Sequence, residues 1–254
     1  MKLMNYYCML GAAMACAMAF SSCSGSDDSE TPDNPVVEGE LPAEVPYTDL
    51  QLTGTQREAM QASNEFAVSL MKDVMEMQGG ESTVVSPFSL YTALSMVANG
   101  DKGTTRDRIL EALGFGKGEA GLEQLNDFNS FMTRNLPTLD SRAYALVSNS
   151  VWLNNSMRVL EPFSESLEKW YGARVASLPD LHSDAARHQI NEWCADKTRG
   201  MTPEFLKENL KGDMALINAT YFAGIWTEGF RKEATAKATF TNQDGTRTPV
   251  DMMR

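Results

Sequence analysis

The chain has 254 residues, of which 43% are hydrophobic and 22% are charged, a composition typical of globular proteins. This length is sufficient for one or two domains with a sizeable hydrophobic core. The net charge of −12 provides no basic surface for phosphate groups, which excludes nucleic acid as an expected partner. Eight acidic residues lie between Ser24 and Gln56, a segment without Lys or Arg, so the rest of the chain is only mildly acidic.

Residues 1–23 have the pattern of an export signal. Lys2 supplies a positive charge, and Cys8 to Phe20 is an apolar run that is too short to span a membrane comfortably. Small residues then precede Cys23, and a polar stretch follows it. The segment predicts a lipoprotein-type signal peptide with Cys23 as the lipidated residue, and the alternative is an ordinary secretory peptide cut nearby. We expect an exported protein on the outer membrane or cell surface, otherwise periplasmic or extracellular.

Residues 24–54 predict a tether between this anchor and the folded domain. The segment contains four prolines among acidic and small residues, and it cannot bury enough apolar surface to order itself. Residues 55–254 then form the expected folded domain.

The first predicted helix begins at Thr55, which forms a capping-box pattern with Glu58, and ends at Gly79. Its methionines favour a core-facing stripe over a binding groove. Residues 82–85 predict a short strand. Ser86 and Pro87 have the residue types of an N-cap and a first helical turn.

The helix that follows, residues 87–98, is apolar on every side, as is typical of a helix buried all round. Downstream we expect a helix at 104–113 that is capped by Thr, and helices at 119–136, 162–171 and 183–198. We also expect strands at about 143–152, 174–178 and 214–222, with Val151 and Trp152 on opposite faces of the first, and a hairpin at 240–250 with Asp244-Gly245 at its turn. The pattern predicts a mixed α and β domain around a large sheet.

Motifs for catalysis and cofactors are weak. The six residues from Gly116 to Gly121 match G-x-G-x-x-G by letter, but a predicted helix precedes them where a dinucleotide loop needs a strand. His182 and His188 do not have metal-ligand spacing, and no G-x-S-x-G occurs. Cys194 shares a predicted helical face with apolar residues, which favours a buried thiol over a nucleophile. We therefore expect no enzymatic activity, no cofactor and no metal site.

Three segments resemble the serpin family of protease inhibitors. They are "STVVSPFSLYTALSMVANGDKGTTRDRILEALGF", "INEWCADKTRGMTPEFL" and "LINATYFAGIWTEGF". The first resembles the second and third helices of that family, the second its Asn-x-Trp-x-x-x-x-Thr-x-Gly segment, and the third resembles a strand of its central sheet. They occur in family order, so the resemblance covers residues 55–254.

The resemblance implies an α+β fold, with several helices packed on a large central β-sheet that is incomplete at the C-terminus. It also implies a mechanism: a serine or cysteine protease cleaves a bait loop, which inserts into the sheet and distorts the bound protease. The shutter, where the sheet opens, would comprise Ser86, Pro87, Ser89 and Asn218, and Trp226 would mark the breach where insertion begins. From the residues alone, a helix cap and a core tryptophan are the alternatives.

In the family the bait loop lies near the C-terminus, so we expect the reactive-site bond beyond Arg254 and no inhibition by residues 1–254 alone. The expected partner of a longer chain is a serine or cysteine protease, with the membrane contacted through the lipid only. We expect a monomer with a risk of polymerisation, because an incomplete sheet leaves strand edges unpaired. A non-inhibitory serpin-like binding protein and an inactive truncated gene product are the alternatives.

Overall fold

The computed structural model describes residues 49–254 except 80–82, 140–142, 225 and 227. The predicted signal peptide, Cys23 and most of the predicted tether therefore lie outside the described residues. The described residues form α1 (Gly54–Gln78), α2 (Pro87–Gly100), α3 (Thr104–Ala112), α4 (Gly118–Asn135), η1 (Leu136–Thr138), β1 (Ala143–Asn154), α5 (Glu161–Tyr171), β2 (Arg174–Leu178), α6 (Asp184–Lys197), β3 (Met214–Gly224), η2 (Lys232–Ala234), β4 (Ala236–Thr241) and β5 (Arg247–Met252).

The central sheet has the strand order β2-β1-β3. Strand β1 runs parallel to β2 from the pair Ser150–Arg174 onward, and antiparallel to β3 along almost its whole length. The expected mixed α and β domain around a central sheet is confirmed, and so are the predicted bounds of β2.

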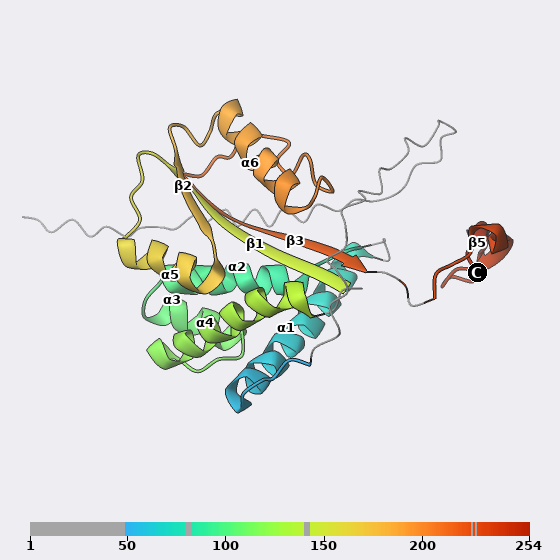
Figure 1. The fold of residues 1–254 in the computed structure, drawn as a ribbon, viewed down its shortest axis with the longest axis horizontal. Coiled ribbons are helices and arrows are strands. Elements are labelled where there is room, and N and C mark those ends of the chain that lie inside the picture. Colours follow the sequence, from blue (N-terminus) through green and yellow to red (C-terminus); the bar gives the residue numbers. More distant parts are fainter. Residues whose placement is uncertain (1–48, 80–82, 140–142, 225, 227) are drawn as a thin grey trace, which may run out of the picture.

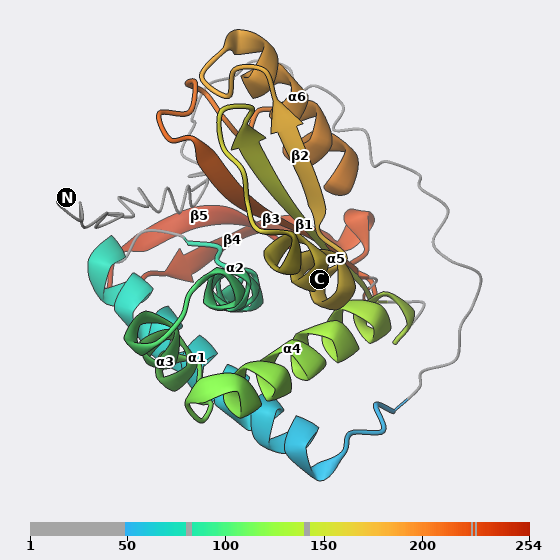
Figure 2. The same cartoon turned by 90° about the vertical axis from the view of Figure 1, so that its left-hand side faces the viewer.

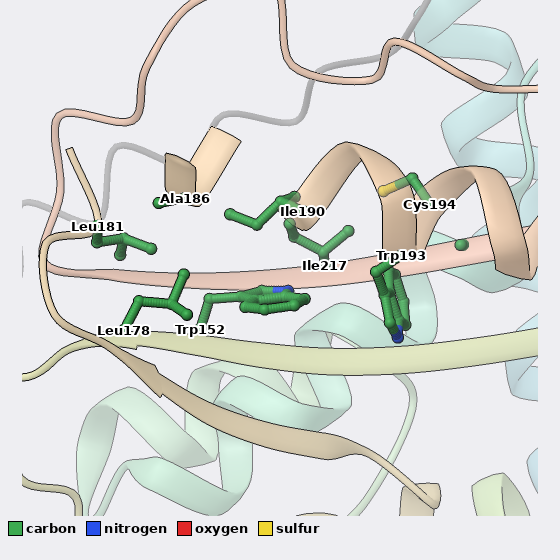
Figure 3. Close-up of a cluster of buried hydrophobic side chains, with 9 residues drawn as sticks. Trp152, Leu178, Leu181, Ala186, Ile190, Trp193, Cys194 and Ile217 are labelled. Carbon is green, nitrogen blue, oxygen red and sulfur yellow. The ribbon is translucent and has the colours of Figure 1, made fainter. Parts of the chain in front are cut away.

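Helices cover both faces of this sheet (Figures 1 and 2). Helix α6 packs on one face, where Trp152 of β1 and Ile217 of β3 contact Ile190 and Trp193 (Figure 3). Helices α2 and α5 pack on the other face, where Val151 of β1 belongs to the same buried cluster as residues of both helices. Because side chains alternate along a strand, Val151 and Trp152 point to opposite faces, as their spacing predicts.

A second helical layer lies beyond α2. Its core joins α1, α2, α3 and α4 around Tyr91, which is fully buried and has Phe66 and Phe128 packed edge-on against its ring. From Pro87 to Asn99 no residue of α2 is exposed, which confirms the helix buried all round. The β4–β5 hairpin, with its turn around Gly245, is also confirmed.

The cap of α1 differs from the prediction. Thr53, and not Thr55, is the N-cap: its Oγ1 accepts from the N–H of Gln56, while Oε1 of Gln56 accepts from the N–H of Thr53. The predicted pair Thr55–Glu58 was therefore wrong by two residues. Leu50, in the predicted tether, packs against the core of the helical layer. This contact fixes where the chain enters the helix, and a local motif cannot report it.

Two other local predictions were wrong. Helix α3 begins after Gly103, which has a positive φ of 64° and no side-chain cap, although a Thr cap was predicted. Residues 83–85 have no strand assignment, and the described strand pairings do not include them. A strand is defined by its hydrogen-bonded neighbour, so a β-branched run without a paired neighbour stays irregular.

Within the described part of the chain, no helix is long and apolar enough to cross a membrane.

Candidate functional site

The predicted shutter residues of α2 lie at its first turn, facing the central sheet. Ser86 is the N-cap, Pro87 follows at the first helical position, and the Oγ of Ser86 accepts from the N–H of Ser89 at 3.4 Å. The Oγ of Ser89 also donates to that of Ser86 at 2.8 Å. Capping thus explains why Ser86 and Pro87 occur here, but it leaves the other contacts of the Ser89 hydroxyl unexplained.

Ser89 connects the helix to the sheet above it. Its Oγ lies 2.6 Å from Oγ1 of Thr220 on β3, and Thr220 Oγ1 lies 3.2 Å from Oδ1 of Asn218 on the same strand. A hydroxyl carries one proton, so while Ser89 donates to Ser86, Thr220 can donate either to Ser89 or to Asn218. The hydroxyls can therefore exchange partners without a change of backbone.

The chain of hydrogen bonds continues across the sheet to α5. Asn218 Nδ2 donates to Oδ1 of Asn149 at 2.7 Å, and Asn149 Nδ2 donates to the backbone oxygen of Tyr171 at 2.9 Å. Asn149 and Asn218 are directly opposite each other in the β1–β3 register. The six residues, which we call the shutter chain, are Ser86, Ser89, Thr220, Asn218, Asn149 and Tyr171.

Because the shutter chain is partly buried, losing its hydrogen bonds would cost free energy. Asn149 is 3% exposed, and Tyr171, at the end of the chain, is 1% exposed. A satisfied hydrogen bond adds about 1 kcal/mol net, whereas a buried polar group left without a partner costs about 1–3 kcal/mol. Parting β3 from α2 or from β1 would therefore require replacement partners for these side chains.

Tyr171 joins the shutter chain to a second polar cluster among the helices. Its hydroxyl donates to Asn126 Oδ1 on α4 at 2.6 Å and accepts from Asn99 Nδ2 on α2 at 3.1 Å. Burial raises the pKa of Tyr171 above its ordinary value, and the hydrogen bond from Asn99 opposes that rise only in part. The phenol therefore stays protonated, and its hydroxyl remains available as a donor.

The resemblance to the serpin family named Ser86, Ser89 and Asn218, which this chain of hydrogen bonds joins, and Pro87, which takes no part in it; it did not name Thr220, Asn149 or Tyr171. The shutter role of these residues stays a prediction. Thr220 carried a usable signal, because it is two residues from Asn218 and therefore on the same face of a strand. Asn149 and Tyr171 carried none, since their partners lie in other elements.

Trp226, the predicted breach residue, is separate from this site. It follows the end of β3, is 71% exposed, and packs edge-on against Phe230 with ring centroids 5.6 Å apart. The alternative of a core tryptophan was therefore wrong, whereas the breach role stays a prediction.

Cys194 lies in the core between α6 and the sheet, as predicted. It is 2% exposed, and burial raises the pKa of its thiol to about 11. A thiol in this state is a poor nucleophile at neutral pH. The described ranges also contain no cluster of His, Cys, Asp or Glu suited to hold a metal ion.

The sequence of the chain is similar to those of known proteins. The family model for the serpin (serine protease inhibitor) matches residues 61–254. Pig corticosteroid-binding globulin is 28% identical over 212 residues, covering 83% of this chain and 52% of that protein. Human leukocyte elastase inhibitor is 31% identical over 197 residues, covering 76% of this chain and 51% of the inhibitor.

The structure of an Arabidopsis serpin in its native stressed conformation matches with a TM-score of 0.68 and 27% identity, over 80% of this chain and 52% of that one. The chain spans about half the length of the curated relatives that it matches. The expected α+β fold, incomplete relative to the serpin domain, is confirmed. Since the family model matches well over half of the chain, the protein belongs to the serpin family.

Proposed function

We propose that the protein is a serpin-type inhibitor of serine or cysteine endopeptidases that acts through cleavage of a bait loop and its insertion into the central sheet. The observation that carries this proposal is the shutter chain. It ties α2 to β3 through hydroxyls that can exchange partners, and it lies directly beneath a strand that must move when the sheet opens.

The position of β3 supports the proposal. Among the described strands β3 pairs only with β1, so its other edge is where a further strand adds. Insertion beside β3 would pull Thr220 away from Ser89, at the point where Thr220 can transfer its hydrogen bond to Asn218. An exchange of this kind lowers the cost of opening, because no hydroxyl is left unsatisfied.

A non-inhibitory binding function is the second candidate. Its support is the 28% identity to pig corticosteroid-binding globulin, whose name describes a binding protein. An inhibitor and a binding protein differ in the bait-loop region, and the matched half of the family does not separate them.

We further propose export as a lipoprotein that is anchored through Cys23 and carries the folded domain on an acidic tether. Metabolic labelling with palmitate in the native host tests this directly. Label on the wild type that is absent from Cys23→Ala supports the anchor, and label that persists in the variant contradicts it.

The inhibitor proposal is tested on the intact gene product purified from its host, with chain 1–254 in parallel. Each is incubated with trypsin, chymotrypsin, elastase and papain. Trapping leaves the protease esterified or thioesterified to the inhibitor, so a complex that survives boiling in detergent is expected with at least one of them. Cleavage of the intact product by every protease without such a complex would contradict trapping and favour the binding function.

A further inference from the structure

A slot opens at the edge of the central sheet that is opposite to the β3 edge. Strand β2 pairs with β1 only from Ser150 onward, so the seven residues Ala143–Asn149 have a strand neighbour on the β3 side alone among the described strands. The reason is local. Helix α5 ends at Tyr171, and its C-cap Gly172 has a left-handed φ of 56°. The N–H of Ala173 donates to the backbone oxygen of Leu167 in α5 instead of to β1.

The slot is a cavity of about 670 Å³, which is within the range of roughly 300–1,000 Å³ of ligand pockets. From β1 it is lined by Val147, Ser148 and Asn149, the last three of the seven unpaired residues, and Ala143–Leu146 extend the unpaired edge beyond the cavity. Helix α6 forms one wall through Gln189, Glu192, Trp193, Asp196 and Lys197, and the other elements contribute Thr133 of α4, Tyr171, Gly172 and Arg174.

The slot lies between the helices that cover the two faces of the sheet, where a further strand beside β1 would lie. Helix α6 lies on one face of the sheet and α5 on the other (Figure 1). A chain that paired with β1 here would continue the line of β2 and lie between these layers. Its side chains would alternate between Trp193 on the α6 side and Thr133 on the α4 side.

Polar groups in the slot match a peptide backbone. Every second residue of Ala143–Asn149 directs its N–H and C=O toward the open side, because an antiparallel partner engages only the alternate ones. The hydroxyl of Thr133 is buried and has no hydrogen-bond partner within the described part of the protein. Such donors and acceptors are satisfied by an extended chain and not by an apolar ligand.

The charges of the slot point to a neutral occupant. Two carboxylates, Glu192 and Asp196, are balanced by Arg174 and Lys197, and Lys197 is ion-paired with Asp196 at 2.8 Å. The guanidinium of Arg174 lies over the ring of Trp152, 5.1 Å from its centroid. The slot therefore has no net charge that would attract a simple anion or cation. A neutral peptide backbone binds through hydrogen bonds and does not require a net charge.

From these contacts we propose that the slot binds an extended, uncharged peptide segment of a partner protein by strand addition to Ala143–Asn149. The seven residues span about 23 Å at the usual rise of a strand, enough for a segment of about five residues with its ends in solvent. This site uses the β1 edge, so it does not depend on the insertion mechanism proposed for the β3 edge.

The test uses the full chain and the probe acetyl-Thr-Val-Thr-Val-Thr-amide. Binding is measured by titration calorimetry, and its location by hydrogen–deuterium exchange. We expect saturable binding and slowed exchange of backbone amides within Ala143–Asn149. The matched control is the same peptide with both valines N-methylated, which keeps the side chains and removes two backbone donors. At least tenfold weaker binding of the control is expected.

A protein variant tests the same slot from the other side. Ser148 has the strand parity of Trp152, so Ser148→Phe places a ring between β1 and α6 and should abolish binding. Thr239→Phe, on exposed β4, is the matched control and should bind as the wild type does. If Ser148→Phe does not fold, the N-methylated peptide still decides the question.

Four results would overturn the proposal. Three are no binding of the probe, equal binding of the N-methylated peptide, and protection from exchange outside β1. The fourth is a dimer in sedimentation experiments that Ser148→Phe abolishes, which would assign the slot to a second copy of the chain.

Discussion

Ser89 has two functions in one turn of helix. Its N–H is capped by Ser86, and its Oγ contacts Thr220 across the interface between α2 and β3. A helix cap requires only Ser86, so the contact with Thr220 is what the sheet adds. The contact with Ser86 is therefore local and visible in the sequence, whereas the contact with Thr220 depends on a residue 131 positions away.

Replacing Ser89 should weaken the attachment of β3. Ser89→Leu removes the hydroxyl and places a larger side chain where Thr220 lies, so we expect the free energy of unfolding to fall by about 3 kcal/mol. We also expect a larger polymer fraction after mild heating. Urea unfolding and size-exclusion chromatography measure the two effects, with Ser156→Leu at an exposed turn as the control. An unchanged free energy of unfolding and an unchanged monomer fraction would contradict the shutter assignment.

Cys194 should make stability depend on alkaline pH. Burial raises the pKa of its thiol to about 11, so the folded state keeps the thiol neutral at a pH at which the thiol of the unfolded chain, with its ordinary pKa of 9.0, has ionised. The unfolded state then binds fewer protons, and the free energy of unfolding falls as the pH rises from about 9 to 11. Chemical unfolding across this range should give a shallower fall for Cys194→Ala than for the wild type. Identical slopes would exclude the thiol as the cause.

At the scale of elements, helix starts were the least predictable features. Periodic apolar spacing located the long helices, and the alternation along β1 located its two faces, because both patterns are local consequences of backbone geometry. The cap of α1 was misplaced because Thr53 and Thr55 are both plausible N-caps, and the choice depends on where Leu50 meets the core.

The two threonines give a direct test of this cap. Thr53→Ala removes the acceptor for the N–H of Gln56, so the free energy of unfolding should fall by about 1 kcal/mol. Thr55 is inside the helix and exposed, and Thr55→Ala should leave stability unchanged or slightly raised. Thermal unfolding of both variants distinguishes the caps. A larger loss for Thr55→Ala would restore the cap that the sequence predicted.

At the scale of the whole molecule, apolar surface lies open on α1. Val68 is 71% exposed and Met75 is 66% exposed, and both line an apolar groove with Ala67 and Met71. A contiguous apolar surface of this kind promotes association between molecules. The edge of β3 that has no strand partner among the described residues is a second physical reason for the predicted risk of polymerisation.

Charge on this surface should suppress association. We expect the double variant Val68→Lys, Met75→Lys to lower the fraction of oligomer formed by chain 1–254 by at least half, because burying either ammonium group at an interface is costly. The double variant Gln51→Lys, Thr55→Lys changes two exposed residues outside the groove, adds the same two charges and is the control. Sedimentation velocity measures the fraction. An equal reduction by this control would assign the effect to net charge alone.

The sequence by itself determined the order and type of most elements and the burial of α2 and Cys194, and each of these follows from spacing within one element. Three residues of the shutter chain, Ser86, Ser89 and Asn218, were named from the resemblance to the serpin family and not from spacing. The tertiary structure decided which side chains meet: Asn149 contacts Asn218, and Tyr171 joins the shutter chain to the polar cluster among the helices. It also formed the slot beside β1. These pairings join elements far apart in the chain, and a local pattern does not specify its distant partner. That is also why residues 83–85 stay irregular although their composition favours a strand.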